Sequence, residues 1–446
     1  MKISIKPIKK MHPAQILALG YLTVILLGTI LLHLPIATTT PGSMSWIDSL
    51  FTATSATAVT GLVVVNTSTA FTIFGQVVIM FLIQFGGLGL MTMSTLIALL
   101  IGRRIGIRER VVMQRELGQF TLSGLVKLVR QILRITAIIE GMGMVILFFR
   151  WRPLLGTGKA LYYGLFHSVS AFCNAGFDLF GNSMQDFSQD YITLFTISSL
   201  LIIGGLGFGV ITDLLHLRKN KRLTFHSRMV LRVSLILIIV GWFFVFFAEY
   251  KNPDTLGSLS FGGKVISAYF TGVVPRTAGF ESVPTGKLKI PTLFLTIVLM
   301  FIGASPASTG GGIKTTTFGV VAVTVLNMIR GKSETEVFQR RVAKETIVDA
   351  MSVVFLAMML IFVDMIIITF AEEGKSFLAL LFETVSAFGT VGLSTGITPK
   401  LSSISKFMLI LTMYAGRVGP MTVAVALSKR QKNTNYRYPE EKILVG

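Results

Sequence analysis

Eight long apolar runs constrain this chain more than any other feature. A helix needs about 20 apolar residues to cross a bilayer, and each run is long enough for one crossing. The charged residues are few, 14% of the chain, whereas soluble proteins carry about 25%. The sequence therefore predicts an all-α polytopic membrane protein with eight transmembrane helices. The runs cover residues 15–34, 73–101, 132–150, 191–215, 229–248, 291–329, 346–370 and 406–428.

Basic residues indicate which side of the membrane each loop occupies. The chain has 41 Lys and Arg against 21 Asp and Glu, a formal net charge of +20. The basic residues gather in the N-terminal leader, in 102–134, 217–232 and 330–345, and after 428. Short loops rich in Lys and Arg stay in the cytoplasm, so eight crossings place both termini there. This multi-pass topology in the cell membrane explains the charge, and we expect no nucleic-acid partner.

Cysteine and histidine show no catalytic or metal-binding pattern. Cys173 is the one cysteine, which excludes an internal disulfide. The five histidines have no metal-site spacing, and no GxSxG or HExxH motif is present. We therefore expect no enzyme activity and no cofactor in this chain.

Four shorter segments between the long runs repeat one another. They cover 46–60, 160–175, 261–275 and 376–391, too short to cross a bilayer but suited to re-entrant helices. Aligned on one glycine each, they read FTATSATAVTGL, FHSVSAFCNAGF, YFTGVVPRTAGF and FETVSAFGTVGL. An aromatic residue stands ten positions before each glycine, and serine stands six before it in three segments. The chain is predicted to contain four tandem span–pore helix–span repeats, with four re-entrant pore loops around a central pore.

These repeats divide the chain into six segments. The two ends, 1–13 and 429–446, are expected to be cytoplasmic. The repeats themselves are expected at 14–127, 128–228, 229–345 and 346–428, and the second span of the third repeat is expected to be broken.

The turn after each short helix carries a predicted ion-binding site. Irregular backbone at membrane depth is tolerated only inside protein or beside a water-filled cavity. Four such loops around one axis would form rings of carbonyl oxygens, which can replace the hydration shell of a monovalent cation. Surface helices with glycine caps are the alternative, but they explain neither the four-fold recurrence nor the number of spans. The predicted filter residues are Val59, Thr60, Gly61, Asn174, Ala175, Gly176, Thr277, Ala278, Gly279, Thr390, Val391 and Gly392.

Each second span contains a glycine cluster, at 86–89, 204–207, 303–312 and 416–419. In repeats one and two, close helix packing is a sufficient explanation, and a moving part is the alternative. The third cluster, GASPASTGGGIKTTT, lies in a run too long for one simple span, and proline with successive glycines breaks a helix. We predict two half-helices joined by an intramembrane gating loop; a passive kink is the alternative. The predicted gate residues in this loop are Gly303, Ala304, Ser305, Pro306, Ser308, Thr309, Gly310, Gly311, Gly312 and Lys314.

Two features of this region need separate interpretations. GGGIKTTT resembles a phosphate-binding loop, but Ile313 separates glycine from lysine and the flanks are apolar, so no nucleotide site is expected. Arg417 lies midway between Lys406 and Lys429, where a charge facing lipid costs from about 3 to more than 10 kcal/mol. We therefore place Arg417 in the pore below the filter, as part of the gate. The alternative is a structural arginine bound to helix carbonyls, including those of the 303–312 loop, or to a buried acid.

The filter motifs resemble those of the Trk/Ktr/HKT potassium transporter superfamily, and most closely those of its bacterial Ktr membrane subunits. The resemblance covers about residues 14–430 and rests on AVTGL, NAGF, RTAGF, TVGL and GRVGP. It implies a homodimer with one pore in each subunit, docked on a cytosolic ring of nucleotide-binding regulatory subunits. It also implies potassium as the transported ion, with Gly61 favouring potassium over sodium and with sodium as a candidate stimulatory ion. Membrane lipid is a further expected partner.

Some alternatives stay open at this point. Channel-like permeation is favoured by four carbonyl loops, whereas a secondary symporter coupled to sodium or protons would need a second ion site. Glu383 and Asp364 lie in apolar surroundings, where they could line an ion path or pair locally. Contacts with the regulatory ring are expected at 102–127, 217–228 and 429–446, where anionic lipid is the alternative partner.

Overall fold

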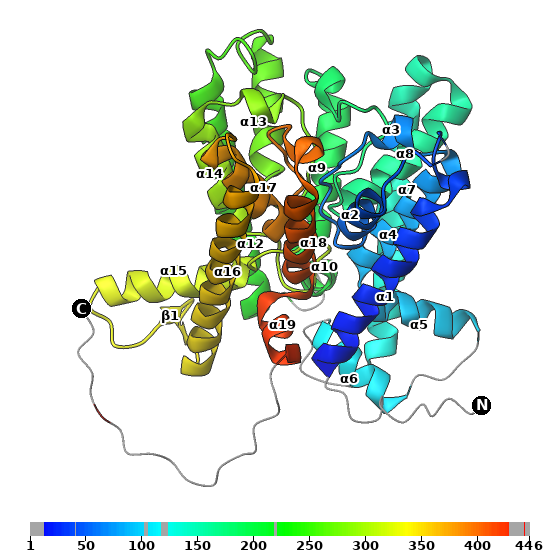
Figure 1. Cartoon of the computed structure of the whole chain (residues 1–446). Helices are drawn as coiled ribbons and strands as arrows, with labels where there is room; N and C mark the ends of the chain where they lie inside the picture. The colour runs from blue at the N-terminus through cyan, green and yellow to red at the C-terminus, as the bar shows by residue number, and fades with distance from the viewer. Residues whose placement is uncertain are drawn as a thin grey trace.

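The computed structural model describes residues 13–40, 42–101, 106–116, 124–217, 221–427 and 441. The N-terminal leader, most of the C-terminal tail and parts of two basic loops, with the regulatory contacts expected there, lie outside the described residues. Four helices are long and apolar enough to cross a membrane, and Figure 1 shows them distributed around the molecule. They are α1 (Pro13–His33), α7 (Leu125–Leu155), α12 (Phe225–Glu249) and α16 (Lys344–Ala371).

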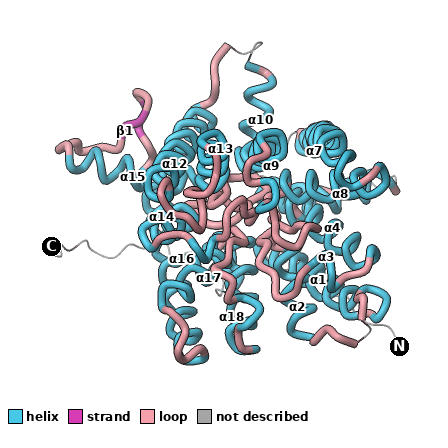
Figure 2. The backbone as a smooth tube through the Cα atoms, turned by 90° about the horizontal axis from the view of Figure 1, so that it is seen from above, coloured by secondary structure: helices cyan, strands magenta, loops and turns pink. Residues whose placement is uncertain are grey.

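A short helix follows each long helix and points toward the centre of the molecule. Side-chain caps fix two of the starts: Ser45 accepts the amide of Asp48, and Ser260 accepts the amide of Gly263. Seen from above, the loops gather in the middle and helices surround them (Figure 2). The short helices are α2 (Trp46–Thr57), α8 (Thr157–Phe172), α13 (Phe261–Val273) and α17 (Phe377–Gly389).

The chain then returns through a third helix and breaks. These helices are α4 (Ile73–Leu88), α9 (Tyr191–Leu206), α14 (Ile290–Phe301) and α18 (Ser403–Val418). After the break come α5 (Leu90–Leu100), α10 (Phe208–Leu215), α15 (Thr315–Ile329) and α19 (Pro420–Leu427). The first two pairs are bent by 107° and 100°. Counting each bent pair as one span gives up to six spans in the described residues, so eight crossings remain a prediction.

The expectation that close packing alone explains the glycine clusters of repeats one and two was incomplete. The last glycine of three clusters has positive φ, +88° at Gly89, +91° at Gly207 and +94° at Gly419, and each marks the helix break. The first glycine does serve packing: a Cβ at Gly86 would strike the carbonyl oxygen of Thr57, at the end of α2. One cluster therefore combines close contact with a backbone angle that only glycine adopts readily.

The remaining elements are small. They are α3 (Thr67–Ala70), α6 (Ile107–Glu116), the two-stranded hairpin β1 (Glu336–Val337) and β2 (Arg340–Arg341), and the short 3-10 turns 35–37, 185–187, 285–287 and 398–400.

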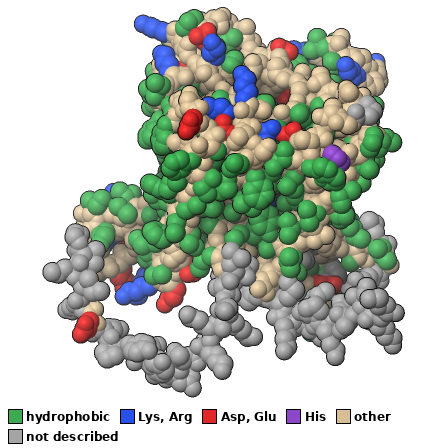
Figure 3. All heavy atoms as spheres, viewed as in Figure 1, with side chains coloured by type: hydrophobic (Ala, Val, Ile, Leu, Met, Phe, Trp, Pro, Cys, Tyr) green, Lys and Arg blue, Asp and Glu red, His purple; other side chains and the backbone are tan. Residues whose placement is uncertain are grey.

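The distribution of polar and apolar side chains on the surface is that of a membrane protein. Figure 3 shows hydrophobic side chains covering the middle of the molecule, with charged side chains above and below. Phe370 and Phe247 in the long helices are 82% and 72% exposed, whereas the short helices bury Ser and Thr such as Ser55, Thr54 and Ser386. Exposed apolar side chains together with buried polar ones are expected when lipid replaces water around a protein.

Candidate functional site

The four predicted filter glycines form a closed ring. A Cβ built on each glycine would strike the carbonyl oxygen of the residue that precedes the next glycine in the ring. The glycine–carbonyl pairs are Gly61–Ala175, Gly176–Ala278, Gly279–Val391 and Gly392–Thr60. Since the last pair returns to the first loop, the four loops surround one axis in chain order. A side chain at any of these glycines would displace the neighbouring loop.

The four loops also share one backbone conformation. The glycines have φ of +91°, +70°, +66° and +90°. The residues two positions earlier are left-handed as well: Val59 (58°), Asn174 (60°), Thr277 (71°) and Thr390 (50°). Among the described residues, none donates a hydrogen bond to the carbonyl oxygens of the twelve predicted filter residues. These oxygens remain available to a cation, which is what a carbonyl site requires.

Serine residues of the short helices hold three of the loops through hydrogen bonds. The amide of Thr60 donates to the carbonyl of Ser55 (2.8 Å), and the amide of Gly61 donates to the Ser55 hydroxyl (3.1 Å). Ser386 makes the same pair of contacts in the fourth loop, at 2.9 Å and 3.1 Å. In the second loop, the amide of Ala175 donates to the carbonyl of Ser170 (2.7 Å). The serine six positions before the glycine therefore fixes the carbonyl-bearing turn.

The 302–314 loop, which carries the predicted gate residues, contacts three of the filter loops directly. The Thr309 hydroxyl donates to Asn174 Oδ1 (3.1 Å), and the amide of Gly311 donates to the Thr390 hydroxyl (3.0 Å). A Cβ at Gly310 would strike the Thr277 hydroxyl. The side chains two positions before the filter glycines thus contact this loop.

The same loop is bound to the helix break of the second repeat. Its amides at Ser305 and Thr309 donate to the carbonyls of Gly205 (3.0 Å) and Gly204 (3.3 Å). In return, the amide of Phe208 donates to Ala307 (3.0 Å). Within the loop, Ala304 donates to Gly311 (3.3 Å), and Lys314 Nζ donates to the carbonyl of Gly310 (2.9 Å). The loop is an ordered structure held on several sides; Gly303, Pro306, Ser308 and Gly312 complete it.

Arg417 connects the loop to the first repeat. Its guanidinium donates to the carbonyls of Thr309 and Gly86, and to that of Gly87 at 3.3 Å. The expected contact with the 303–312 loop is therefore present. Arg417 also lines a cavity of about 170 Å³ with Lys314, Tyr21 and Glu116. Tyr21 and Glu116 were not predicted to line this cavity, because both come from helices outside the repeated motifs.

A second cavity, of about 520 Å³, lies on the other side of the ring. The four filter glycines line it together with Asp178, Glu281 and Lys287. Burial, with a smaller contribution from the nearby Glu383, raises the pKa of Glu281 to about 7, although hydrogen bonds from Thr285 and Ser394 oppose the shift. Glu281 was not identified from the sequence, because one carboxylate after a filter motif has no spacing to mark it.

The two carboxylates singled out in apolar surroundings pair locally. Glu383 accepts hydrogen bonds from Ser394 (2.8 Å), the amide of Thr395 (2.8 Å) and Thr398 (2.5 Å). Asp364 accepts the hydroxyl of Thr412 on α18. Both contacts favour the local-pairing interpretation over an ion path. The described residues contain no group of His, Cys, Asp or Glu that could hold a metal ion.

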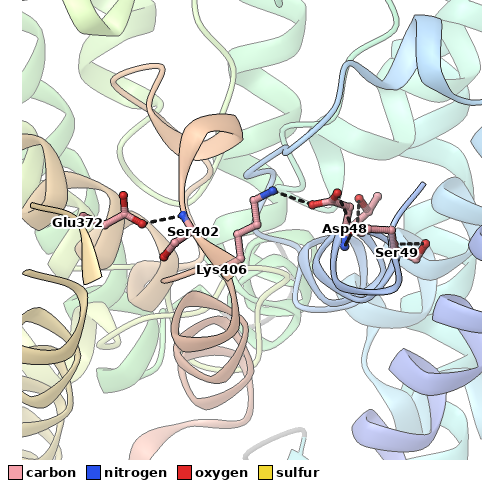
Figure 4. A network of polar contacts seen from close by, with 7 residues as sticks. Asp48, Ser49, Glu372, Ser402 and Lys406 are labelled. Carbon is pink, nitrogen blue, oxygen red and sulfur yellow. Dashed lines mark hydrogen bonds and ion pairs between the residues drawn. The ribbon is translucent and has the colours of Figure 1, made fainter. Parts of the chain in front are cut away.

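Polar contacts at the outer edge join the fourth repeat to the first. Figure 4 shows Lys406 of α18 reaching Asp48 of α2, with a separation of 2.8 Å. Beside it, the Glu372 carboxylate accepts the amide of Ser402 (2.6 Å). Although burial opposes the change, hydrogen bonds from Lys375 and Ser402 hold the pKa of Glu372 down at about 2. The Lys406–Asp48 contact therefore joins α18 to α2, in addition to the contact between the Gly392 and Thr60 loops.

Comparison with known proteins gives consistent matches over the whole chain. The Ktr system potassium uptake protein B of Bacillus subtilis is 43% identical over 97% of this chain and 97% of its own length. The potassium/sodium uptake protein NtpJ of Enterococcus hirae is 38% identical over 98% of both. The crystal structure of the potassium transporter TrkH from Vibrio parahaemolyticus superposes with a TM-score of 0.71 at 18% identity, covering 92% of this chain and 85% of that one; this likeness shows the fold alone. The TrkH family of cation transport proteins matches residues 4–437. The chain therefore belongs to the TrkH family of cation transport proteins.

Proposed function

We propose that this chain takes up potassium through a channel-like pore. The observation that carries the proposal is the closed ring of four glycines, in which the carbonyls of the filter residues accept no hydrogen bond from the described residues. Carbonyl oxygens around an axis substitute for the hydration shell of potassium. The names of the relatives from Bacillus subtilis and Vibrio alginolyticus, both Ktr system potassium uptake proteins B, support the choice of ion.

In this proposal the loop 303–314 and Arg417 form the gate. The loop lies against Asn174 and Thr390 of the filter, and Arg417 places a positive charge beside a cavity on the ion path. A fixed cation opposes entry of another cation at short range. Withdrawal of the loop and of Arg417 would open the path.

Control of the gate is assigned to cytosolic nucleotide-binding regulatory subunits. The word "system" in the names of the relatives supports a protein that works with other subunits. We further propose a homodimer with one pore in each chain, four repeats with the boundaries given above, and both termini in the cytoplasm.

Coupled transport is the second candidate. The relative from Enterococcus hirae is named a potassium/sodium uptake protein. This name supports a sodium-coupled or sodium-stimulated mechanism as the second candidate. Coupling needs a second ion site and alternating access. Glu383 and Asp364, the two carboxylates considered for an ion path, pair locally instead.

Flux into proteoliposomes separates the two candidates. The purified chain, with and without its regulatory subunits, is placed in vesicles with an outward-to-inward potassium gradient as the single driving force. We expect potassium uptake without sodium, and faster uptake on adding a potential that is negative inside. An absolute requirement for sodium with a fixed stoichiometry would exclude the channel-like mechanism. Absence of potassium flux under every condition would exclude both.

A further inference from the structure

The third filter loop is built differently from the other three. In loops one, two and four, the amide just before the glycine donates to the carbonyl of the serine six positions before the glycine. In the third loop Val273 occupies the serine position, and the amide of Ala278 donates to Val274 instead (3.1 Å). Pro275, which lies between them, has no amide hydrogen and cannot continue the helix. The third loop therefore lacks the serine contact. Its amide also donates to the residue four positions earlier, whereas the amides of the other loops donate to the residue five positions earlier.

Arg276 occupies this altered turn, three positions before Gly279. Its guanidinium extends away from the ring, and Nη2 donates to the hydroxyl of Ser234 on α12 at 3.0 Å. Both side chains are buried, with exposed fractions of 7% for Arg276 and 3% for Ser234. The guanidinium Nε has no hydrogen-bond partner in the structure. No ion pair joins Arg276 to an acid among the described residues.

A buried guanidinium without a counter-charge is unfavourable and is seldom kept without a role. Arg276 and the residue after it both contact the second filter loop. The carbonyl of Arg276 accepts Asn174 Nδ2 (3.4 Å), and the following hydroxyl, that of Thr277, accepts the same amide (3.1 Å). Asn174 in turn accepts Thr309 of the 302–314 loop. A shift of Arg276 would therefore displace filter loops two and three together.

We propose that Arg276 is a positioning residue that anchors the third filter loop to α12 through Ser234, in place of the missing serine, and so sets the ion selectivity of the filter. This inference rests on the proposed potassium pore. Selectivity among monovalent cations depends on the number, spacing and rigidity of the carbonyls around the ion. Without its anchor, the third loop keeps its carbonyl oxygens, but their spacing is no longer fixed. The filter should then admit sodium more easily while it still conducts potassium.

Three variants of the full chain test the anchor. Arg276→Met removes the side-chain hydrogen bond and the charge, Arg276→Lys keeps the charge, and Ser234→Ala removes the acceptor alone. Potassium and sodium fluxes are measured separately in proteoliposomes, with thermal stability in detergent as the check on folding. Arg150→Met, at an arginine paired with Asp190 at 2.8 Å and 38% exposed, is the matched control.

We expect Arg276→Met to lower the potassium-to-sodium flux ratio about tenfold, the loss associated with one hydrogen bond to a charged group. Ser234→Ala should lower the ratio in the same direction, and the double variant should be no worse than Arg276→Met. Arg276→Lys should recover part of the ratio, because an ammonium can still donate to Ser234. The control should keep the wild-type ratio.

Other results overturn the inference. Equal losses of potassium and sodium flux at an unchanged ratio would show that Arg276 is merely structural. A Ser234→Ala chain with normal selectivity would show that the contact with α12 does not set the filter, even if Arg276→Met fails to fold. If the wild-type chain conducts no potassium at all, the proposed function fails, and that result precedes any measurement on the variants.

Discussion

The proposed topology gives this molecule an outer half, which carries the four filter loops, and an inner half, which carries the helix breaks, and the two halves differ in symmetry. On the outer side, each of the four loops has a left-handed residue two positions before a glycine of positive φ. Each loop also makes the same contact with the next loop. On the inner side, the helix breaks differ in kind: the α4–α5 and α9–α10 pairs are bent by 107° and 100°, whereas the 302–314 loop separates α15 from α14. Figure 1 shows α5 and α15 extending away from the centre on opposite sides.

The difference follows from what each half is proposed to do. A cation on the axis interacts with all four carbonyls, so one displaced loop weakens the whole site. An obstruction needs one segment in the path, and extra copies would compete for the same space. The outer half therefore depends on four similar loops, and the inner half depends on one loop with Arg417.

Gly392→Ala should have the largest effect, because it damages one corner of the outer ring. Gly392 and Gly396 both have φ of +90°, so alanine adds about 1–2 kcal/mol of backbone strain at either position. At Gly392 the new methyl would also strike the Thr60 carbonyl oxygen. Since overpacking costs about 1–3 kcal/mol more, we expect potassium flux in proteoliposomes to fall about 100-fold.

Gly396→Ala is the control for this experiment, because nothing lies within 4 Å of a Cβ at that position. Its flux should stay close to that of the wild-type chain. Equal losses in the two variants would assign the effect to backbone strain and remove the support for a carbonyl ring.

Arg417→Gln should act in the opposite direction, because it damages the inner half. The change weakens the contacts with Thr309 and Gly86 and removes the charge beside the inner cavity. Single substitutions on a coupling path change it by about 0.5–2 kcal/mol, so we expect basal potassium flux to rise about threefold to tenfold, with weaker control by regulatory subunits. Lys400→Gln, an exposed change on the outer side, should leave flux unchanged. Unaltered flux in a folded Arg417→Gln chain would contradict the gate.

The sequence predicted the outer half better than the inner half, for a physical reason. An aromatic and a glycine at fixed spacing recur four times, and a serine between them recurs three times, because each loop faces the same axis. The glycine clusters also recur, but packing at Gly86 and a helix break at Gly89 use the same residue type. The directions after each break depend on tertiary contacts, such as that between Phe208 and Ala307, and no local pattern records those contacts.

External pH should have a moderate effect through the outer cavity. Burial raises the pKa of Glu281 to about 7, so lowering the external pH from 8 to 6 would convert the carboxylate to its neutral form. Asp178 also lines the cavity and keeps part of its negative charge when Glu281 is neutral. Because one charge in water-filled space is worth about 1 kcal/mol or less, we expect the apparent affinity for potassium to fall about twofold to threefold.

Glu281→Gln should abolish this pH dependence and should have the lower affinity at every pH. High ionic strength should reduce the effect in the wild-type chain, because salt screens charges over about 10 Å at 0.1 M. A pH response that survives in Glu281→Gln would assign the titration to another group.

Asp48→Asn should have the smallest effect on flux, because it loosens the rim and leaves the filter intact. Asp48 and Lys406 are 2.8 Å apart with exposed fractions of 21% and 12%, so solvent screens them only in part. The amide keeps one hydrogen bond and loses the ionic component, which costs about 1–2 kcal/mol. We expect a lower melting temperature in detergent and normal potassium selectivity. Lys406→Gln should give a similar loss, and the double variant should show little further change, since both remove one contact between the fourth and first repeats. Additive losses would mean that the pair does not close the ring.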